Sequence, residues 1–332
     1  MSEKKVGVAV AGLGFVGGRA HVPAFKKIPG AELVAVIDVI EELAQKVATK
    51  YNVAYYLDHK EALKNPEIDA IVVAVPTPFH YKLAFDAIAS NKHVLCEMPL
   101  TANIAESIVL GKLAEKAGLV FMPNLNFRFT PNYVKTKELI EQGVIGKPLA
   151  ITFREFIPAK ELATQWPRDS WAWNKEKSGG YPDFTLSVWS IDLVRWLLNS
   201  EIENVHWMTN YAQLEEIENF TGYQTMGIIK LSNGVVGTLH YSATVALGQG
   251  TSKLEVFGSN TKTLTAKWNN FLMLTGEDSE KQEWNFTEKG TKVWGHFQAD
   301  SYFIECILTE KKPMITVDDA IKAQNVASKI VS

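Results

Sequence analysis

The chain of 332 residues contains only two cysteines, Cys96 and Cys306, which is too few for a disulfide-stapled fold. No apolar run is long enough to span a bilayer, and the first residues, MSEKK, carry no apolar core of a secretory leader. The formal net charge is −3 and no basic block occurs, so nothing favours nucleic acid or a membrane as a partner. No cysteine and histidine residues have zinc-ligand spacing. These absences predict a globular protein of the reducing cytoplasm, without a metal.

The most informative stretch is Val6–Gly17, VGVAVAGLGFVG. Its first half, rich in small and β-branched residues, is typical of a buried parallel strand. Gly12, Gly14 and Gly17 follow at G-x-G-x-x-G spacing. In such a turn the first glycine permits a tight bend, the second lets a pyrophosphate approach the backbone, and the third lets the next helix pack on the strand. We expect that helix to continue to Ile28.

A second strand, Leu33–Ile37, ends at Asp38, 21 residues beyond Gly17. An acidic residue at this place accepts hydrogen bonds from a ribose diol, and its charge repels a 2′-phosphate. The three residues after Asp38 include no arginine or lysine. The stretch therefore predicts a dinucleotide site that prefers NAD over NADP.

Strands and helices alternate as far as about residue 124, which predicts a parallel sheet with helices on both faces. Beyond that residue the pattern changes: an alternating strand is expected at 149–155, a helix at 182–198, and a hairpin around Ser232-Asn233-Gly234. The predicted fold class is α/β. Residues 1–124 would form a Rossmann-type, doubly wound parallel sheet, and residues 125–332 an α+β domain with a mostly antiparallel sheet.

Six stretches resemble, in order, the Gfo/Idh/MocA family of sugar and polyol oxidoreductases: AGLGFVGGRAHVPAF, AVPTPFHYKLAFDAI, KHVLCEMPL, NFRFTPNY, SGGYPDFTLSVWSIDLVRWL and SYFIECIL. They extend over nearly the whole chain. The resemblance implies a Rossmann domain that binds NAD, followed by a domain that binds a sugar-like substrate. The sheet of that second domain commonly serves oligomer contacts in the family, so the resemblance also implies a homodimer or homotetramer.

By this resemblance, the glycine turn and the loops near Val75–Thr77 and Glu97 would touch NAD, Arg128 would lie at the junction of the two domains, and Trp171 would lie near the nicotinamide end. The predicted cofactor-binding residues are Gly12, Gly14, Phe15, Val16, Gly17, Asp38, Val75, Pro76, Thr77, His80, Glu97, Met98 and Trp171. The predicted substrate-binding residues are Met98, Arg128, Trp166, Trp171, Tyr181, Thr185 and Trp189.

The chain departs from the family pattern at three residues that would carry acid/base chemistry. The family's Glu-Lys-Pro triplet is Glu97-Met98-Pro99 here, and methionine neither titrates nor donates a hydrogen bond. An aspartate and a histidine four residues apart in the family are replaced by Thr185 and Trp189. A positioned acid or base contributes about 10²–10⁴ in rate. A working dehydrogenase would therefore need a substitute.

Tyr181 is the best candidate for that substitute, with Thr185 and a water molecule as the second. Tyr181, Thr185 and Trp189 are spaced i, i+4 and i+8, and they share one face if the helix already includes Tyr181. Asp183 lies about 200° away from that face. Tyr181 has the alternative role of a packed aromatic, and Trp189 either stacks on a sugar or the nicotinamide or packs in the core.

The sequence thus predicts an NAD-dependent oxidoreductase that acts on a sugar, polyol or related carbonyl compound by direct hydride transfer, with non-standard acid/base residues. Reduction of a C=C or C=N bond would demand less of the missing lysine. Two alternatives remain open because the usual residues are replaced: a catalytically silent sensor of NAD and a sugar, and a lyase or hydrolase in which NAD is recycled.

Overall fold

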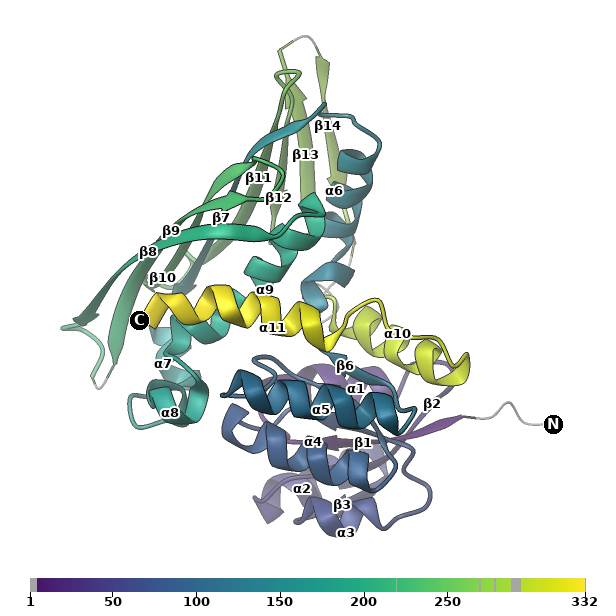
Figure 1. The fold of residues 1–332 in the computed structure, drawn as a ribbon. Helices are drawn as coiled ribbons and strands as arrows, with labels where there is room; N and C mark the ends of the chain where they lie inside the picture. The colour runs from purple at the N-terminus through teal and green to yellow at the C-terminus, as the bar shows by residue number, and fades with distance from the viewer. Residues whose placement is uncertain (1–4, 219, 269, 278, 288–293, 332) are drawn as a thin grey trace. The chain divides into compact units, whose positions relative to one another are not determined.

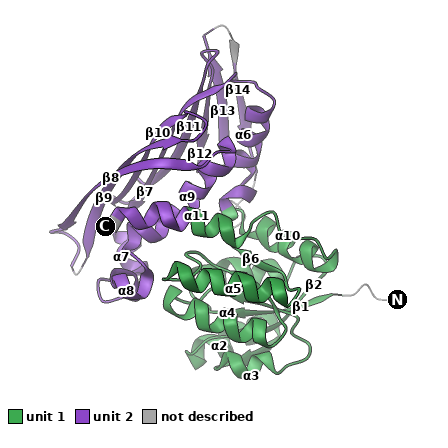
Figure 2. Cartoon of the chain, viewed as in Figure 1, with its two compact units in different colours: residues 1–126, 294–322 green, residues 127–293, 323–332 purple. Residues whose placement is uncertain are grey.

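The computed structural model describes residues 5–331 except 219, 269, 278 and 288–293. The chain forms two compact units, unit 1 of residues 1–126 and 294–322 and unit 2 of residues 127–293 and 323–332 (Figure 2). The sequence predicts that everything after residue 124 belongs to the second domain. Residues 294–322 instead belong to unit 1, because helix α10 (His296–Leu308) packs against strands β1 (Val6–Ala11) and β5 (His93–Cys96).

Unit 1 contains a six-stranded parallel sheet in the order β3-β2-β1-β4-β5-β6. Besides β1 and β5, its strands are β2 (Ala31–Ile37), β3 (Ala54–Tyr56), β4 (Ala70–Val73) and β6 (Phe121–Pro123). This is the strand order of dinucleotide-binding Rossmann folds. Strands β1 and β4 are buried along their whole length, as expected for parallel strands covered on both faces. The predicted doubly wound parallel sheet is confirmed.

The helices of unit 1 cover this sheet (Figure 1). Besides α10 they are α1 (Val22–Phe25), α2 (Glu41–Tyr51), α3 (His59–Leu63), α4 (His80–Ala89) and α5 (Ile104–Lys116), with short segments η1 (Gly17–His21) and η2 (Thr77–Phe79). Segment η3 (Asn126–Phe129) and helix α11 (Val317–Ala327) cross the division between the units.

The first helix differs from the prediction. It starts as the π-helical segment η1, in which the Val22 N–H donates to the Gly17 carbonyl, and α1 ends at Phe25 rather than Ile28. Pro23 has no N–H to donate to the carbonyl of Arg19, so the regular α-helical hydrogen-bond pattern is interrupted there.

Unit 2 is built on an eight-stranded sheet in the order β14-β13-β12-β11-β7-β10-β9-β8. The strands are β7 (Pro148–Pro158), β8 (Ile202–Gln213), β9 (Thr221–Leu231), β10 (Val236–Val245), β11 (Thr251–Gly258), β12 (Thr263–Lys267), β13 (Phe271–Gly276) and β14 (Ser279–Asn285). All neighbouring pairs are antiparallel except β7 with β10, which confirms the predicted mostly antiparallel sheet. The predicted hairpin joins β9 to β10, with Gly234 at φ 87°.

Helices α6 (Pro131–Glu141) and α9 (Pro182–Leu198) pack on one face of this sheet, here called the inner face (Figure 1). The remaining elements of unit 2 are α7 (Ala159–Gln165), η4 (Trp171–Trp173), α8 (Lys175–Ser178) and η6 (Ser328–Val331). In β7 the side chains of Ile151 and Phe153 are buried on the inner face, while Arg154 is exposed on the outer one. No helix among the described residues has the length and apolar character needed to cross a membrane.

Candidate functional site

The three glycines of the turn after β1 have different surroundings. A Cβ on Gly12, whose φ is 88°, would lie 2.4 Å from the Ala74 carbonyl oxygen, and a Cβ on Gly17 would lie 1.8 Å from the Gly12 oxygen. Both positions therefore require glycine for the fold itself. A Cβ on Gly14 would meet no atom within 4 Å, so the backbone there borders open space. This open backbone before a helical segment is the form of a pyrophosphate site.

Asp38 follows β2 and fixes the same turn. One carboxylate oxygen accepts from the Leu13 N–H at 2.8 Å, and the other accepts from the Ile40 N–H at 2.9 Å. The side chain stays half-buried, and each carboxylate oxygen can accept more than one hydrogen bond. Asp38 is thus oriented at the carboxyl end of β2, where a ribose diol would meet it.

Phe15 and Val16 complete the turn. The Phe15 ring lies 5.6 Å from the Trp294 ring, and the Arg19 guanidinium lies 5.1 Å from the Phe15 ring centre. Phe15 therefore connects the turn to the segment that precedes α10, within unit 1.

The loops after β4 and β5 hold the other predicted cofactor-binding residues of unit 1: Val75, Pro76, Thr77, His80, Glu97 and Met98. His80 is buried, and its ring nitrogens lie 2.9 Å from the Pro99 oxygen and 2.7 Å from the Val75 oxygen. The imidazole thus ties the two loops together at the edge where ligands of parallel sheets bind. These two contacts of His80 are structural ones. Met98, in the loop after β5, is 4% exposed.

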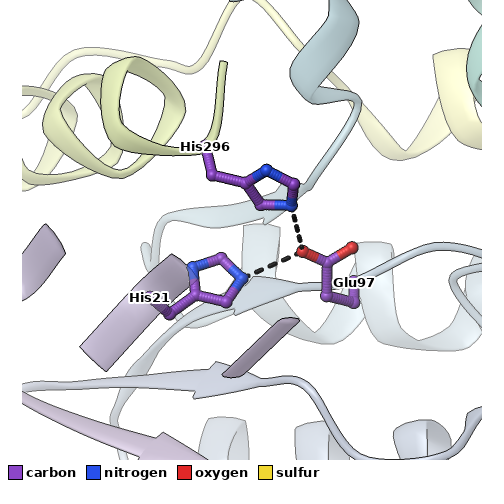
Figure 3. Close-up of side chains that lie close together, drawn as sticks. All are labelled: His21, Glu97 and His296. Carbon is purple, nitrogen blue, oxygen red and sulfur yellow. Dashed lines mark hydrogen bonds and ion pairs between the residues drawn. The ribbon is translucent and has the colours of Figure 1, made fainter. Parts of the chain in front are cut away.

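Unit 1 contains a buried ionic cluster of His21, Glu97, His296 and Asp300, of which Figure 3 shows the first three. Nδ1 of His21 lies 2.9 Å from Asp300, and Nε2 lies 2.9 Å from Glu97. Because both ring nitrogens face carboxylates, both carry protons and His21 is an imidazolium. Burial by itself lowers the pKa of His21, but the carboxylates of Asp300 and Glu97 outweigh burial and raise that pKa to about 10. Hydrogen bonds from His21 and His296 hold the pKa of Glu97 well below its usual value despite burial.

His21, Glu97 and His296 also have ligand-type atoms within 4.8 Å of one another, the one such group in the part of the chain that the structure describes. The hydrogen bonds assign protons to those atoms. Asn126 Nδ2 donates to His296 Nδ1 at 3.2 Å, which leaves His296 Nε2 to donate to Glu97 at 3.4 Å. Both nitrogens that would face a metal therefore carry protons, and the cluster acts as a hydrogen-bonded ion pair.

Replacing His21 by phenylalanine should lower the free energy of unfolding by about 3–5 kcal/mol near neutral pH, because two buried carboxylates lose their cation. His21 has a pKa of about 10 in the folded protein against 6.5 when unfolded. The folded state binds more protons in between, so its stabilisation is complete below pH 6.5 and is lost as the pH rises through 10. Denaturant titrations across this range should show the wild-type advantage shrinking.

The matched control is His59→Phe, which removes a half-buried histidine paired with Asp86 at 2.8 Å. Its cost should stay near 1 kcal/mol or below. A His21→Phe difference that does not change between pH 6.5 and 10 would show that His21 is not an imidazolium.

In unit 2, Arg128 is held by an ion pair. Its Nε and Nη2 donate to the two carboxylate oxygens of Asp192 on α9, at 2.7 and 2.6 Å. Arg195 also donates to Asp192, at 3.2 Å, and pairs with Glu201. Arg128 is 7% exposed, and its ion pair with Asp192 holds the start of unit 2 to α9.

The predicted aromatic residues lie around the start of α9. Trp166 and Trp171 form an edge-to-face pair with ring centres 5.8 Å apart. The ring of Tyr181 lies 6.3 Å from Trp173 and 5.5 Å from Tyr211. These rings make one apolar wall beside the N-terminus of α9, of the kind that stacks on sugar faces.

The proposed common face of Tyr181, Thr185 and Trp189 is only partly present. Helix α9 begins at Pro182, and Tyr181 is its extended N-cap residue, whose carbonyl accepts from the Thr185 N–H at 3.0 Å. The Tyr181 hydroxyl makes no hydrogen bond to the described residues. The Thr185 hydroxyl oxygen is buried and has no partner among them either. Trp189 is half-buried.

Comparison with known proteins decides the family. Residues 6–125 match the domain described as the oxidoreductase family with an NAD-binding Rossmann fold, and residues 133–263 match the GFO/IDH/MocA C-terminal domain. The chain belongs to the GFO/IDH/MocA family of oxidoreductases. Its N-terminal domain is therefore an NAD-binding Rossmann domain.

Named relatives agree with this placement. The chain is 30% identical over 256 residues to a myo-inositol 2-dehydrogenase of Thermotoga maritima, which covers 76% of this chain and 72% of the relative. It is 27% identical over 335 residues to a scyllo-inositol 2-dehydrogenase (NAD(+)) of Bacillus subtilis, covering 96% and 91%. The crystal structure of a myo-inositol 2-dehydrogenase from Lactobacillus plantarum superposes with a TM-score of 0.80 at 25% identity, covering 98% and 96%.

Within this GFO/IDH/MocA chain, Asp183 on α9 makes contacts that its predicted place, off the face of Tyr181, does not reveal. Asp183 is buried in the first turn of α9 and accepts from the Tyr211 hydroxyl at 2.9 Å and from the Thr225 hydroxyl at 2.6 Å. Burial raises its pKa. The side chain of Asp183 points away from that of Thr185 and toward the sheet. Helical spacing alone does not reveal this direction.

Glu155 was missed altogether. It is 5% exposed and lies on the inner face of β7, with Ile151 and Phe153. The sequence did contain the signal, because Glu155 continues the alternation of those buried residues. An acidic side chain in a buried strand register marks a candidate functional group.

Proposed function

We propose that this protein is an NAD-dependent oxidoreductase that interconverts a hydroxyl and a carbonyl group of a sugar or polyol. The observation that carries this proposal is the turn at Gly12–Gly17, where Gly14 borders open space while Asp38 holds the turn in place. The family membership and the inositol dehydrogenases among its relatives support the substrate class.

The fit of NAD to unit 1 rests on these same residues. The backbone of the turn and the start of η1 would bind the pyrophosphate, and Asp38 would bind the ribose diol. The loops after β4 and β5 would border the nicotinamide half. When bound, NAD supplies the hydride acceptor or donor. The negative charge of Asp38 would disfavour a 2′-phosphate, which gives the preference for NAD over NADP.

Replacing Asp38 by alanine should weaken NAD binding by about 1.5–3 kcal/mol, the range for hydrogen bonds to a charged group. NADP affinity should not fall by the same factor, because the repulsion of its phosphate is removed together with the contact. Titration of both cofactors by fluorescence measures this. Asp58→Ala is the matched control, since Asp58 also accepts from a backbone N–H, that of Lys60, at the start of α3. Equal losses for NAD and NADP would contradict the role of Asp38 in selection.

In unit 2 the aromatic wall of Trp166, Trp171 and Tyr181 would bind the sugar ring, with Trp189 and Arg128 as further predicted contacts. Tyr181 and Thr185 are the proposed carriers of the hydroxyl proton, and the Thr185 hydroxyl is buried without a partner among the described residues. They would take the place of the lysine, aspartate and histidine that the family resemblance leads one to expect.

Tyr181→Phe should lower turnover by about 100-fold or more while changing substrate affinity little, because only the hydroxyl is removed. Steady-state kinetics under saturating NAD measures the two effects separately. Tyr55→Phe, which removes an exposed hydroxyl in β3, is the control and should leave turnover unchanged. Unchanged turnover in Tyr181→Phe, with a loss in Thr185→Val, would assign the proton to Thr185.

The proposed function is tested by incubating the protein with NAD and a panel of sugars, polyols and sugar acids while following NADH absorbance. A signal with one class of compound supports the dehydrogenase. Cofactor binding without any signal would favour a sensor of NAD and a sugar, or a reaction in which NAD is recycled.

We further propose a second copy of the chain as the partner on the outer face of the unit 2 sheet. Met208, Ile228 and Val236 project from three adjacent strands there and are 50–58% exposed. Such a contiguous apolar patch is typical of an interface, and the molecular mass of the protein in solution would show whether two copies associate.

The cysteines, Cys96 and Cys306, are both free and buried, which suits a cytoplasmic protein.

A further inference from the structure

The ionic cluster of unit 1 contains more negative than positive charge. Its two carboxylates, Glu97 and Asp300, lie on opposite sides of one imidazolium, that of His21. Both oxygens of Asp300 lie close to Nδ1 of His21, at 2.9 and 3.1 Å, which is the way an ionised carboxylate accepts from one N–H. One imidazolium balances one carboxylate, so the three groups together carry one net negative charge.

The neighbours of these three groups add no positive charge. His296 faces Glu97 through Nε2, but its Nδ1 accepts from Asn126, so the ring carries one proton and no charge. Asn124, a neutral amide, also donates to Glu97. No lysine or arginine among the described residues pairs with Glu97. The next residue, Met98, is uncharged, where the triplet of the family has a lysine.

Glu97 is the carboxylate through which this charge reaches the surface. Its side chain is 9% exposed, whereas those of His21 and Asp300 have no exposed surface. His21 and Asn124 both donate to Oε1 of Glu97. The one hydrogen bond of Oε2 with the described residues is from the Met98 N–H, at 3.3 Å. The protein thus fixes one oxygen and leaves the other with capacity to act on a ligand.

In the proposed NAD site, Glu97 belongs to the nicotinamide half. It directly follows β5, and its N–H donates to the Val73 carbonyl at the end of β4, at 2.9 Å. Asp38, at the end of β2 on the other side of β1, would bind the ribose of the adenosine half. Because a dinucleotide lies across the carboxyl ends of these strands, the nicotinamide half would lie over β4 and β5.

The oxidised and reduced cofactors differ in charge at one ring. The nicotinamide ring is a cation in NAD⁺ and is neutral in NADH, while the amide, hydroxyl and phosphate groups are the same. A negative charge stabilises a nearby cation and has no such effect on a neutral ring. At the effective dielectric near a protein surface, a unit charge within about 10 Å of a cation contributes roughly tenfold in affinity.

We propose that the unbalanced charge of Glu97 makes the protein favour NAD⁺ over NADH. The proposal rests on the NAD site of the proposed function, and it names the residue that determines which oxidation state of the cofactor is bound. Met98 contributes through its lack of charge, since a lysine there would offset the carboxylate. The protein therefore holds its cofactor preferentially in the form that accepts a hydride.

Separate calorimetric titrations of the full chain with NAD⁺ and with NADH, near neutral pH, test this without a sugar. Glu97→Gln removes the charge and keeps the shape of the side chain. We expect the ratio of the NAD⁺ to the NADH dissociation constant to rise about tenfold in this variant. Hydrogen bonds between Glu97 and the cofactor are lost from both forms alike, so they leave the ratio unchanged. A change below threefold overturns the proposal, even if both affinities fall.

Met98→Lys tests the same charge by adding a cation beside it. The ratio should rise in the same direction as in Glu97→Gln, and an unchanged ratio overturns the proposal. If one of the two variants does not fold, the other decides alone. Asp86→Asn is the matched control, because Asp86 also pairs with a histidine, His59 at 2.8 Å, but lies on α4. Its ratio should equal that of the wild type, and a rise as large as in Glu97→Gln contradicts the proposal.

The same titrations separate this proposal from the proposed function. A wild-type protein that binds both forms of the cofactor but oxidises no sugar would reject the dehydrogenase, and the ratios would still decide the role of Glu97. A wild-type protein that binds neither form would overturn the NAD site and this proposal with it.

Discussion

Replacing Gly14 by alanine should leave the fold of unit 1 intact and weaken NAD binding by about 100-fold or more. A Cβ at this position meets no protein atom within 4 Å, so the apo protein has room for it. The same methyl group occupies the space through which a pyrophosphate reaches the backbone. Losing two hydrogen bonds to a charged group costs about 3 kcal/mol or more, which is about 100-fold in affinity.

Gly17→Ala provides the contrast at the same turn. Its Cβ would lie 1.8 Å from the Gly12 carbonyl oxygen, so the backbone itself must move. We expect the free energy of unfolding to fall by about 1–3 kcal/mol, the usual cost of overpacking, or by more. Thermal unfolding and NAD titration of both variants separate the two roles. If the Gly14→Ala protein binds NAD like the wild type, the proposal that the pyrophosphate binds at this turn is wrong.

Replacing Arg128 by methionine should destabilise unit 2 by about 3 kcal/mol or more. The change leaves the Asp192 carboxylate, 1% exposed, without its bidentate partner, although Arg195 still donates to it. Breaking a buried ion pair on one side typically costs 3–5 kcal/mol, because the other charge stays buried. Denaturant unfolding measures the loss.

A double-mutant cycle identifies the cause. Arg128→Met together with Asp192→Asn should cost less than the sum of the two single changes, because no charge is left unpaired. Arg154→Met, on the exposed outer face of β7, should change stability by about 0.5 kcal/mol or less. If Arg128→Met were as stable as the wild type but bound substrate poorly, the substrate-binding role predicted from the sequence would be the main one.

The glycine turn and the Arg128–Asp192 ion pair show which features the sequence predicts and which depend on the tertiary structure. The requirements at Gly12, Gly14 and Gly17 are local: a strand, a tight turn and a helical segment follow one another within a few residues. Spacing and residue type therefore indicated the nucleotide-binding fold, and Asp38 with it. The interruption at Pro23 is local too, and its missing N–H could have been read from the sequence.

The α+β architecture of unit 2 was likewise predictable in outline. Alternation in β7 and the turn at Ser232-Asn233-Gly234 are short-range patterns, and both appear in the structure. What alternation could not decide was the order of the strands. Strand β7 pairs with β10 and β11, far along the chain, and this register is what brings Glu155 beside Tyr241 and Ser252.

The sequence by itself determined the NAD-binding turn, the acid at the end of β2 and the two kinds of sheet, because each depends on neighbours close along the chain. Only the tertiary structure decided the charge states. His21 is an imidazolium because α10 brings Asp300 to it, and burial raises the pKa of Glu155 to about 8. Burial and pairing between distant segments set these charge states, and the spacing of residues along the chain predicts neither of them.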